Sequence, residues 1–175
     1  MPPDFLQYRD PNSDLTVSIA PSVLRLFDDS RQRLWQRERG GVLFAESIGT
    51  DGRLEIVDAT SPHPSDRAGW NWLELDHQRC LDEIAERFSR GLHFIGYWHT
   101  HPERTPTPSA RDLAAFHRNL QGGGIALRKL VAVIVGTDRS TTGVCVALVS
   151  NGEPAPSLLV PVVDTDPQIR CPDRS

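Results

Sequence analysis

The chain has 175 residues, with 19 lysines and arginines against 23 aspartates and glutamates, which gives a formal net charge of −4. This length predicts one domain, since domains commonly hold about 100–200 residues, and the negative charge argues against a protein that coats nucleic acid. No apolar stretch approaches the roughly 18 residues of a membrane span. The N-terminus lacks the basic and apolar regions of a secretory signal, so the cytoplasm is the expected location.

The N-terminal quarter of the chain predicts an arm, a strand and a helix. Residues 1–14 are polar and rich in proline and are expected to form a flexible arm, while residues 15–20 alternate as a strand does. Pro21 and Ser22 indicate the start of a helix that runs to about residue 37. Apolar residues three and four apart predict that this helix buries one stripe, made of Val23, Leu24, Leu26, Phe27, Leu34 and Trp35.

Two strands and a long loop are expected next. Residues 38–47 and 53–60 predict strands, and the Asp51-Gly52 pair between them is a turn signal that predicts a hairpin. Residues 61–76 have no clean period and contain proline, glycine and two tryptophans, so they are expected to form a connecting loop. Long loops in compact domains are often functional.

The rest of the chain predicts two helices and several strands. A helix is expected over 77–90, with a buried face made of Cys80, Leu81, Ile84, Ala85 and Phe88. A strand over 92–101 leads to a third helix over 109–120, and three strands follow at 129–136, 141–149 and 157–163. Residues 15–165 are expected to form a single domain and residues 166–175 a C-terminal tail. The element order predicts the α/β class, a sandwich with a mixed β-sheet flanked by about three helices.

The segment GYWHTHPERTPTPSARD, from Gly96 to Asp112, carries the residues with the clearest chemical meaning. Side chains alternate faces along a strand, so His99 and His101 are expected on one side and Trp98 in packing on the other. Asp112 lies in the first turn of the following helix, where a loop reversal can bring its carboxylate beside the two imidazoles. Two histidines and one carboxylate are a common catalytic zinc set that leaves a fourth position for water.

Each part of this pattern also has a purely structural explanation. An HxH pair on a strand is more often made of surface or core histidines than of metal ligands. Ser109 and Asp112, placed before an apolar run, are by themselves a helix capping box with the serine at the N-cap. The joint pattern H-x-H-P-x6-S-x-x-D after an E-x-x-G-V-L strand favours ligation, and a capped first turn would fix the orientation of Asp112.

These residues resemble the JAMM signature of the JAB/MPN metalloprotease family. The resemblance covers roughly residues 15–165 and rests on the run Glu38–Leu43 together with His99, His101, Pro102, Ser109 and Asp112. The short form with WHTHP is similar to prokaryotic JAB peptidases encoded beside ubiquitin-like conjugation enzymes, including the CD-NTase-associated deconjugases of CBASS antiphage operons. The fold implied is the JAB/MPN sandwich, which is cytidine-deaminase-like.

The resemblance also implies a metal site. His99, His101 and Asp112 would hold Zn²⁺, with water as the fourth ligand. Zinc makes such a water acidic and polarises a scissile carbonyl, which suits amide hydrolysis. Ser109 would donate a hydrogen bond to the developing oxyanion.

Glu38 would be the general base. It stands three residues before Gly41, as the family's glutamate stands before the glycine of its E-x-x-G strand. It would take a proton from the zinc-bound water and hand it to the leaving amine. Glu46 is a rival on the same predicted strand, but it lies beyond the apolar run.

By this resemblance the protein is a zinc-dependent isopeptidase or peptidase that hydrolyses the bond after the C-terminus of a ubiquitin-like or CD-NTase-like conjugated protein. Its implied partners are the ubiquitin-activating-like and ubiquitin-conjugating-like enzymes of the same operon, in antiphage defence or in housekeeping; neither nucleic acid nor a membrane is expected. Such substrates enter as extended tails beside a strand edge. The segment after Thr60 and residues 103–108 are the expected walls of that groove.

Several alternatives stay open. Trp70 and Trp72 could contact a partner's tail or pack within their loop, and His63 and Asp66 could line the groove. A JAB-type amidase that processes a sulfur-carrier or small-molecule adduct is a second candidate function, and a non-catalytic MPN scaffold is a third. The filled ligand and base positions favour an enzyme, and the acidic balance disfavours the related nuclease-like repair proteins.

Overall fold

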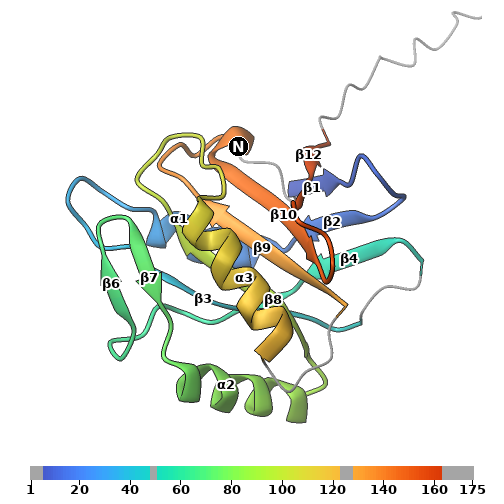
Figure 1. Cartoon of the computed structure of the whole chain (residues 1–175), viewed down its shortest axis with the longest axis horizontal. Helices are drawn as coiled ribbons and strands as arrows, with labels where there is room; N and C mark the ends of the chain where they lie inside the picture. The colour runs from blue at the N-terminus through green and yellow to red at the C-terminus, as the bar shows by residue number, and fades with distance from the viewer. Residues whose placement is uncertain (1–5, 48–50, 123–127, 163–175) are drawn as a thin grey trace, which may run out of the picture.

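The computed structural model describes residues 6–47, 51–122 and 128–162. Within these ranges the helices are α1 (Pro21–Ser30), α2 (His77–Ser89) and α3 (Ala110–Gly122), with a 3-10 turn at Thr141–Gly143. Figure 1 shows α3 lying across the front of the strands and α2 along one side. No helix in the described part of the chain is long and apolar enough to cross a membrane.

The strands form two larger sheets and one hairpin. One sheet holds β3 (Gly40–Ala45), β5 (Asp58–Ala59), β8 (His93–Thr100), β9 (Lys129–Val135), β10 (Val144–Ser150) and β11 (Ser157–Leu158). The other holds β1 (Leu6–Arg9), β2 (Thr16–Ile19), β4 (Arg53–Ile56) and β12 (Val160–Pro161), and the hairpin is β6 (Arg67–Gly69) with β7 (Trp72–Glu74). The first sheet has the order β11-β10-β9-β8-β3-β5 and the second β12-β1-β2-β4. The first is mixed, because β8 and β9 run parallel while its other pairs are antiparallel.

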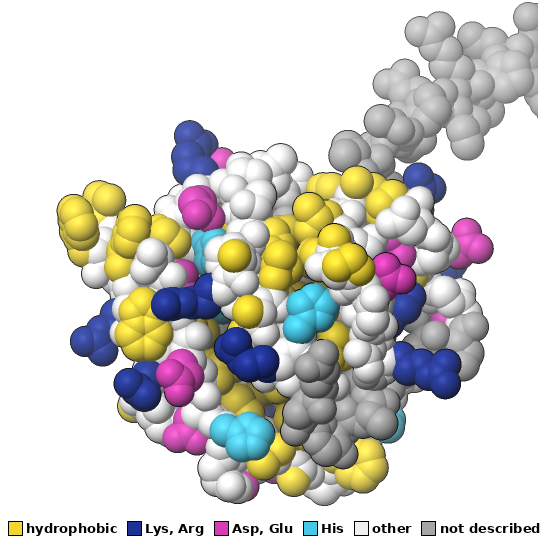
Figure 2. Space-filling view, viewed as in Figure 1, with side chains coloured by type: hydrophobic (Ala, Val, Ile, Leu, Met, Phe, Trp, Pro, Cys, Tyr) yellow, Lys and Arg dark blue, Asp and Glu magenta, His cyan; other side chains and the backbone are white. Residues whose placement is uncertain are grey.

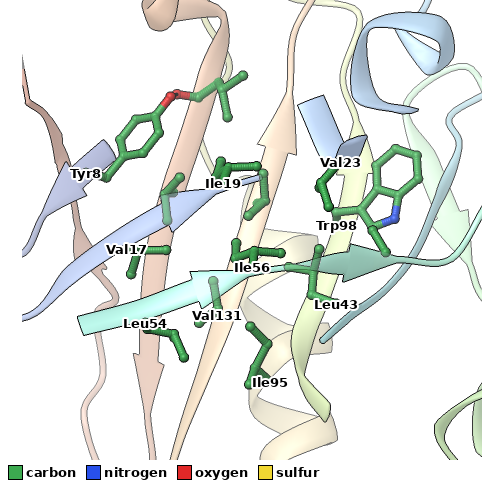
Figure 3. Close-up of a cluster of buried hydrophobic side chains, with 14 of the residues drawn as sticks. Tyr8, Val17, Ile19, Val23, Leu43, Leu54, Ile56, Ile95, Trp98 and Val131 are labelled. Carbon is green, nitrogen blue, oxygen red and sulfur yellow. Dashed lines mark hydrogen bonds between the residues drawn. The ribbon is translucent and has the colours of Figure 1, made fainter. Parts of the chain in front are cut away.

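The larger sheet separates two apolar cores. One of its faces packs against the smaller sheet and α1, in a cluster that includes Val17, Ile19, Ile56 and Trp98 (Figure 3). The opposite face packs against α2 and α3, in a cluster that includes Phe44, Cys80, Phe94 and Phe116. A sheet covered on both faces needs strands that are apolar throughout, which explains the continuous run of β9. The predicted α/β class, with a mixed sheet and three flanking helices, is confirmed.

A bulge in β8 decides which face its histidines occupy. Phe94 and Gly96 pair with successive residues of β3, so Ile95 is an extra residue in this strand. Phe94 and Tyr97 therefore lie on the same, helix-covered face, with ring centres 5.1 Å apart. Glycine is required at 96, because a Cβ there would lie 1.8 Å from a backbone oxygen of β9. Alternation from Tyr97 onward then places His99 on the helix-covered face.

The predicted N-terminal arm is wrong for part of its length. Leu6–Arg9 form β1, which pairs with β2 on one side and β12 on the other. Tyr8 of this strand is buried in the core beneath the smaller sheet. Residues 1–5 and the predicted tail at 166–175 lie outside the described residues.

Helix α1 ends earlier than its apolar pattern predicts. It ends at Ser30, because Arg31 takes an extended conformation and its guanidinium donates to the backbone oxygens of Gly136 and Gly143 at 2.6 and 3.2 Å. Leu34 and Trp35, which were expected in the buried stripe, are 88% and 86% exposed. The prediction is wrong here because a buried arginine, and not the apolar spacing, directs the chain after residue 30.

The predicted hairpin of residues 38–47 with 53–60 forms only in part. β5 pairs antiparallel with β3, as expected, but β4 instead runs parallel to β2 in the other sheet. The chain therefore crosses between the two sheets within residues 53–60, which sequence alternation alone does not show. Residues 61–76 are also more than a connecting loop, since they contain the β6–β7 hairpin.

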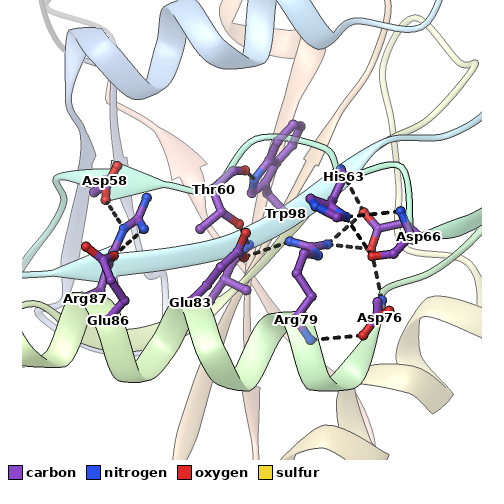
Figure 4. A network of polar contacts seen from close by, with 12 residues as sticks. Asp58, Thr60, His63, Asp66, Asp76, Arg79, Glu83, Glu86, Arg87 and Trp98 are labelled. Carbon is purple, nitrogen blue, oxygen red and sulfur yellow. Dashed lines mark hydrogen bonds and ion pairs between the residues drawn. The ribbon is translucent and has the colours of Figure 1, made fainter.

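Helix α2 starts where predicted and ends one residue earlier, at Ser89, but it buries a different face. Leu81, Ala85 and Phe88 are exposed, and only Cys80 of the expected face is fully buried. The helix instead turns Arg79 and Arg87 toward the protein, where Arg79 pairs with Asp66 and Glu83 and Arg87 pairs with Asp58 (Figure 4). The face of α2 that contacts the rest of the protein is therefore the one that carries the two ion-paired arginines, and part of the predicted apolar face is exposed.

Candidate metal centre

The end of β8 brings the two histidines of the HxH motif together. His99 lies opposite β3, and His101 follows the strand, with its N–H donating to the backbone oxygen of Val135 at 2.9 Å. Both imidazoles are buried, and their ring centres are 4.9 Å apart. Thr100, between them, is tied to the N-terminal end of β3, because its hydroxyl accepts the N–H of Arg39 at 2.9 Å. These contacts fix the backbone that carries both rings.

Asp112 reaches both imidazoles from the first turn of α3. Its Oδ1 lies 3.2 Å from Nε2 of His99 and its Oδ2 lies 3.1 Å from Nε2 of His101. The same Oδ2 accepts the N–H of Ser109 at 2.7 Å, and Oγ of Ser109 accepts the N–H of Asp112 at 3.2 Å. Ser109 and Asp112 therefore form a capping box, and this capped turn presents Asp112 to the two histidines.

Glu38 enters the same site just before β3. Its side chain is buried, and its Oε1 lies 3.9 Å from Nε2 of His101. Its N–H donates to the backbone oxygen of Gly69 at 2.8 Å, which ties this point of the chain to the β6–β7 hairpin. Glu46, the rival for the role of base, is exposed beyond the opposite end of β3.

Burial and charge shift the acid–base groups of the site in different directions. Burial raises the pKa of Glu38 to about 8, although His101 acts to lower it. Burial lowers the pKa of His101, but its hydrogen bonds to Asp112 and Glu103 outweigh this and raise the pKa to about 9. Burial also acts to raise the pKa of Asp112, but the adjacent His101 and His99 hold it well below its usual range. The site thus keeps an ionised carboxylate beside a proton-bearing imidazole, a charge arrangement in which a cation can take the place of protons.

The donor atoms of the site fit a small divalent cation. Nε2 of His99 is buried and has no hydrogen-bond partner among the described residues; it is close to Asp112 but not aligned with it as a hydrogen bond. Ligand atoms of Glu38, His99 and His101 all lie within 4.8 Å of one another. An unpaired buried nitrogen is costly unless something binds it, and two imidazoles with a carboxylate are typical of catalytic zinc sites.

A cavity of about 180 Å³ lies directly beside these residues. It is bounded by β7, α2, β8 and α3, through residues that include Leu73, Leu75, Cys80, Tyr97, Ala115 and Phe116, and it reaches His99 and Asp112. The segment after Thr60 contributes a wall through β7, as expected. Residues 103–108, the other expected wall, do not line it. The lining is mixed, because Glu74, His77, Arg118 and Asn119 stand among the apolar side chains, so the cavity can meet both apolar and polar groups of a ligand.

His63 and Asp66, which were candidates for the groove, are occupied elsewhere. Both carboxylate oxygens of Asp66 bind the guanidinium of Arg79, at 2.6 and 2.7 Å (Figure 4). Asp66 also accepts the N–H of His63 at 3.1 Å and that of Asp76 at 3.0 Å. Neither residue lines the cavity. Asp66 instead ties the loop to α2 through its contact with Arg79.

The two loop tryptophans have different surroundings. Trp70, at the β6–β7 turn, is 53% exposed. Trp72 is half-buried and its ring covers Gly69, where a Cβ would lie 2.0 Å from the indole nitrogen. Trp72 therefore packs within the hairpin, whereas the exposed side chain of Trp70 is accessible to a partner.

One contact of the site was not anticipated from the sequence. Oε2 of Glu103 lies 2.9 Å from Nδ1 of His101, on the side of the ring away from Asp112. Its position directly after the HTHP run was the only signal. An acid in a proline-rich loop has no periodicity from which the direction of its side chain could be predicted.

Comparison with known proteins supplies relatives for this arrangement. A family model described as prokaryotic homologs of the JAB domain matches residues 20–149, a range that contains every residue of the site above. A relative named CD-NTase/cGAS isopeptidase, from Vibrio cholerae, is 32% identical over 135 residues, which cover 75% of this chain and 82% of that protein. A second of the same name, from Escherichia coli, is 26% identical over 134 residues with the same coverage. The solution structure of protein DSY2949 from Desulfitobacterium hafniense shares the fold, with a TM-score of 0.54 at 16% identity over 76% of this chain and 84% of that one.

Proposed function

Because the chain belongs to the prokaryotic JAB family, we propose that it is a zinc-dependent isopeptidase that releases a conjugated protein by hydrolysing the bond after that protein's C-terminal residue. The observation that carries this proposal is the buried contact of Asp112 with both His99 and His101, with Glu38 beside them. A structural histidine cluster would have no need of a second buried carboxyl with a raised pKa.

We assign the metal ligands to His99, His101 and Asp112. Asp112 contacts both imidazoles at 3.2 and 3.1 Å, whereas the carboxylate of Glu38 lies farther away, 3.9 Å from Nε2 of His101 and within 4.8 Å of a ring nitrogen of His99. When bound, zinc would polarise the scissile carbonyl and acidify water. Two neutral nitrogens and one ionised oxygen are the ligands that such a site uses.

Glu38 and Ser109 would act on the reacting groups. Burial raises the pKa of Glu38 to about 8, so this carboxyl can both take a proton from the attacking water and return it to the leaving amine near neutral pH. Oγ of Ser109 accepts the N–H of Asp112, so its own proton is left to donate to a developing oxyanion.

The cavity beside the site would hold the C-terminal tail of the substrate. Its walls from β7, α2 and α3 combine apolar and polar side chains and reach His99 and Asp112, which is where the scissile bond would lie. The short β6–β7 hairpin is two strands wide, and an extended tail could pair with its free edge. The end of the tail that carries the scissile bond would then be held by residues of β7, α2 and α3.

The names of the relatives favour a CD-NTase conjugate as the substrate. On this proposal the protein reverses or processes a conjugation made by ubiquitin-activating-like and ubiquitin-conjugating-like enzymes of the same operon, in an antiphage system. A ubiquitin-like modifier would present the same chemistry, an extended tail that ends in an amide bond. An amidase acting on a sulfur-carrier or small-molecule adduct would need the same metal site but no surface for a second folded protein.

The test is a cleavage assay on a defined conjugate. The purified zinc-loaded protein is mixed with a fusion in which the C-terminal residue of a CD-NTase encoded beside it is joined to a fluorescent protein. The assay is run with and without a chelator. We expect chelator-sensitive cleavage directly after that residue, located by intact mass, and recovery when zinc is returned. A zinc-loaded protein that leaves this fusion and the matching ubiquitin-like fusion intact, but cleaves a single amino acid from a carrier tail, would establish the amidase instead.

A further inference from the structure

Two segments next to the proposed site present large apolar side chains to solvent. Leu34 and Trp35, in the loop between α1 and β3, are almost fully exposed, and Trp70 lies at the turn of the β6–β7 hairpin. Figure 2 shows hydrophobic side chains gathered over this loop and this hairpin, with lysine or arginine side chains beside them. We refer to Leu34, Trp35 and Trp70 as the tryptophan surface. Exposed aromatic groups of this size are frequent anchors of protein interfaces.

The tryptophan surface is held in place by hydrogen bonds between its two segments. The buried side chain of Gln32 donates through Nε2 to the backbone oxygens of Gln36 and Trp70, both at 2.6 Å. The N–H of Glu38 donates to the backbone oxygen of Gly69. The loop and the hairpin therefore form one preorganised surface, which lowers the entropy cost of binding.

The charges around this surface favour an acidic partner. Residues 33–37 carry Arg33 and Arg37, and residues 67–74 carry Arg67, all three exposed. Glu74 is the one acid in these two segments, and it lies 3.7 Å from Arg67. A local excess of arginine on a chain with a net charge of −4 is selective for carboxylates on the facing protein.

The position of the surface identifies its partner. Trp35 is three residues before Glu38, and the hairpin that carries Trp70 also supplies Leu73 to the cavity. We propose that the tryptophan surface binds the folded body of the substrate protein, through an apolar area flanked by carboxylates, while the tail of that protein lies in the cavity. This inference rests on the proposed function.

The test compares a folded substrate with its tail alone. The variant Leu34→Ser/Trp35→Ser is measured on the CD-NTase fusion and on a short peptide of the same tail joined to a fluorogenic amine. The matched control is Phe88→Ser, which removes an exposed aromatic side chain from α2. We expect kcat/KM on the fusion to fall about tenfold or more, as for a lost interface anchor, with the peptide rate and the control nearly unchanged.

The outcomes separate this inference from the function it rests on. Equal losses on fusion and peptide, or no loss on either, would overturn it. A dimer of the wild-type protein that the double variant converts to monomer would assign the surface to a second copy and also overturn it. A wild-type protein that cleaves neither substrate would instead contradict the proposed function.

A separate observation concerns Glu103, on the other side of His101. A carboxylate can only accept, so its 2.9 Å contact requires a proton on Nδ1 of His101 and leaves Nε2 to face Asp112. The backbone of Glu103 is itself held, because its oxygen accepts the N–H of Thr137 at 2.8 Å. The side chain of Glu103 is 57% exposed, but the loop that carries it is anchored at this residue.

We propose that Glu103 is a positioning residue that fixes the tautomer and orientation of His101 for metal binding. Partners of this kind commonly contribute about 10–100-fold to metal affinity. Arg104 is a matched neighbour for comparison, since it is exposed and its ion pair within the described part of the chain is with Asp138.

Zinc affinity, measured by competition with a chelating dye, tests this role without reference to cleavage. We expect Glu103→Ala to weaken zinc binding about 10–100-fold, Glu103→Asp to recover part of it, and Arg104→Ala to stay within about twofold of wild type. Excess zinc should restore the cleavage rate of Glu103→Ala. Unchanged affinity in Glu103→Ala would overturn the inference, whereas a wild-type protein that binds no zinc would contradict the metal site itself.

Discussion

Two buried polar clusters lie on the helix-covered side of the larger sheet, and they differ in one respect that bears on function. In the cluster around Arg79, the guanidinium is bound by Asp66 and Glu83 at 2.6 and 2.7 Å. In the cluster around His99 and His101, Asp112 contacts both rings, and Oε1 of Glu38 lies 3.9 Å from Nε2 of His101. Among the described residues, each cluster leaves one buried nitrogen without a hydrogen bond: Nε of Arg79 in the first and Nε2 of His99 in the second.

The two unpaired nitrogens have different chemistry. Nε of a guanidinium is only a donor and cannot bind a cation; leaving it unpaired costs stability, and the two carboxylate pairs of Arg79 act against that cost. Nε2 of an imidazole can present a lone pair, and beside an ionised Asp112 it can bind a cation. The comparison teaches that burial and ion pairing alone do not mark a functional site. A buried ring nitrogen that can offer a lone pair beside a carboxylate is what distinguishes the candidate metal site from the Arg79 cluster.

The largest expected effect is the loss of metal from the histidine cluster. His99→Ala and Asp112→Ala should each abolish zinc binding and cleavage, because each removes a ligand of a site with three protein ligands. The metal-free melting temperature of His99→Ala should fall only by the cost of removing a buried ring, since its Nε2 makes no hydrogen bond with the described residues. Metal analysis after gel filtration and a thermal melt provide the two measurements. Retained zinc in both variants would break the comparison.

The next effect separates the base from the ligands. Glu38→Ala should lower the cleavage rate by about 10²–10⁴, the usual contribution of a general base, while zinc stays bound. Glu46→Ala is the matched control, because it removes a carboxylate that is exposed past the far end of β3. Activity in Glu38→Ala together with its loss in Glu46→Ala would transfer the role of base to Glu46.

In the Arg79 cluster, removal of one partner should lower the stability of the fold and leave zinc binding unchanged. Asp66→Ala should destabilise the fold by about 3–5 kcal/mol, because it leaves a buried arginine with an unpaired charge. Zinc bound per folded molecule should not change. Glu74→Ala breaks an exposed pair and should cost about 1 kcal/mol or less. Urea unfolding measures both variants, and equal stability of the two would show that the Arg79 cluster is not the structural one.

The smallest effect concerns Cys80, which lies next to Arg79 in the chain and lines the cavity beside the histidines. Burial raises the pKa of its thiol to about 11, although Arg79 acts to lower it. Because the thiolate is the reactive form, Cys80 should react slowly with a maleimide near neutral pH and faster as the pH rises toward 11. Peptide mapping by mass spectrometry follows this residue separately from the other cysteines. Rapid labelling at neutral pH would mean that the cavity is solvated.

Much of the candidate site could be predicted because it depends on local rules. Strand alternation places His99 and His101 on one side, and a capping box orients Asp112 over a single helical turn. Glu103 was not predicted, because its loop has no regular period. The apolar stripe at Leu34 and Trp35 was misread, because helical spacing cannot show that Arg31 ends the helix by binding two distant carbonyl groups.

The sequence by itself determined the α/β class and, to within one residue, the bounds of α2, because each follows from spacing within a few turns or strand residues. The metal ligands His99, His101 and Asp112 stay a prediction of the same local kind. Tertiary structure alone decided the rest. It placed β4 in the second sheet and ended α1 at Ser30. It also set the face of the histidines, through a bulge at Ile95 next to a glycine whose backbone β9 approaches too closely for any side chain. Contacts between distant segments are not encoded in any local period, and so they become visible only when the chain is folded.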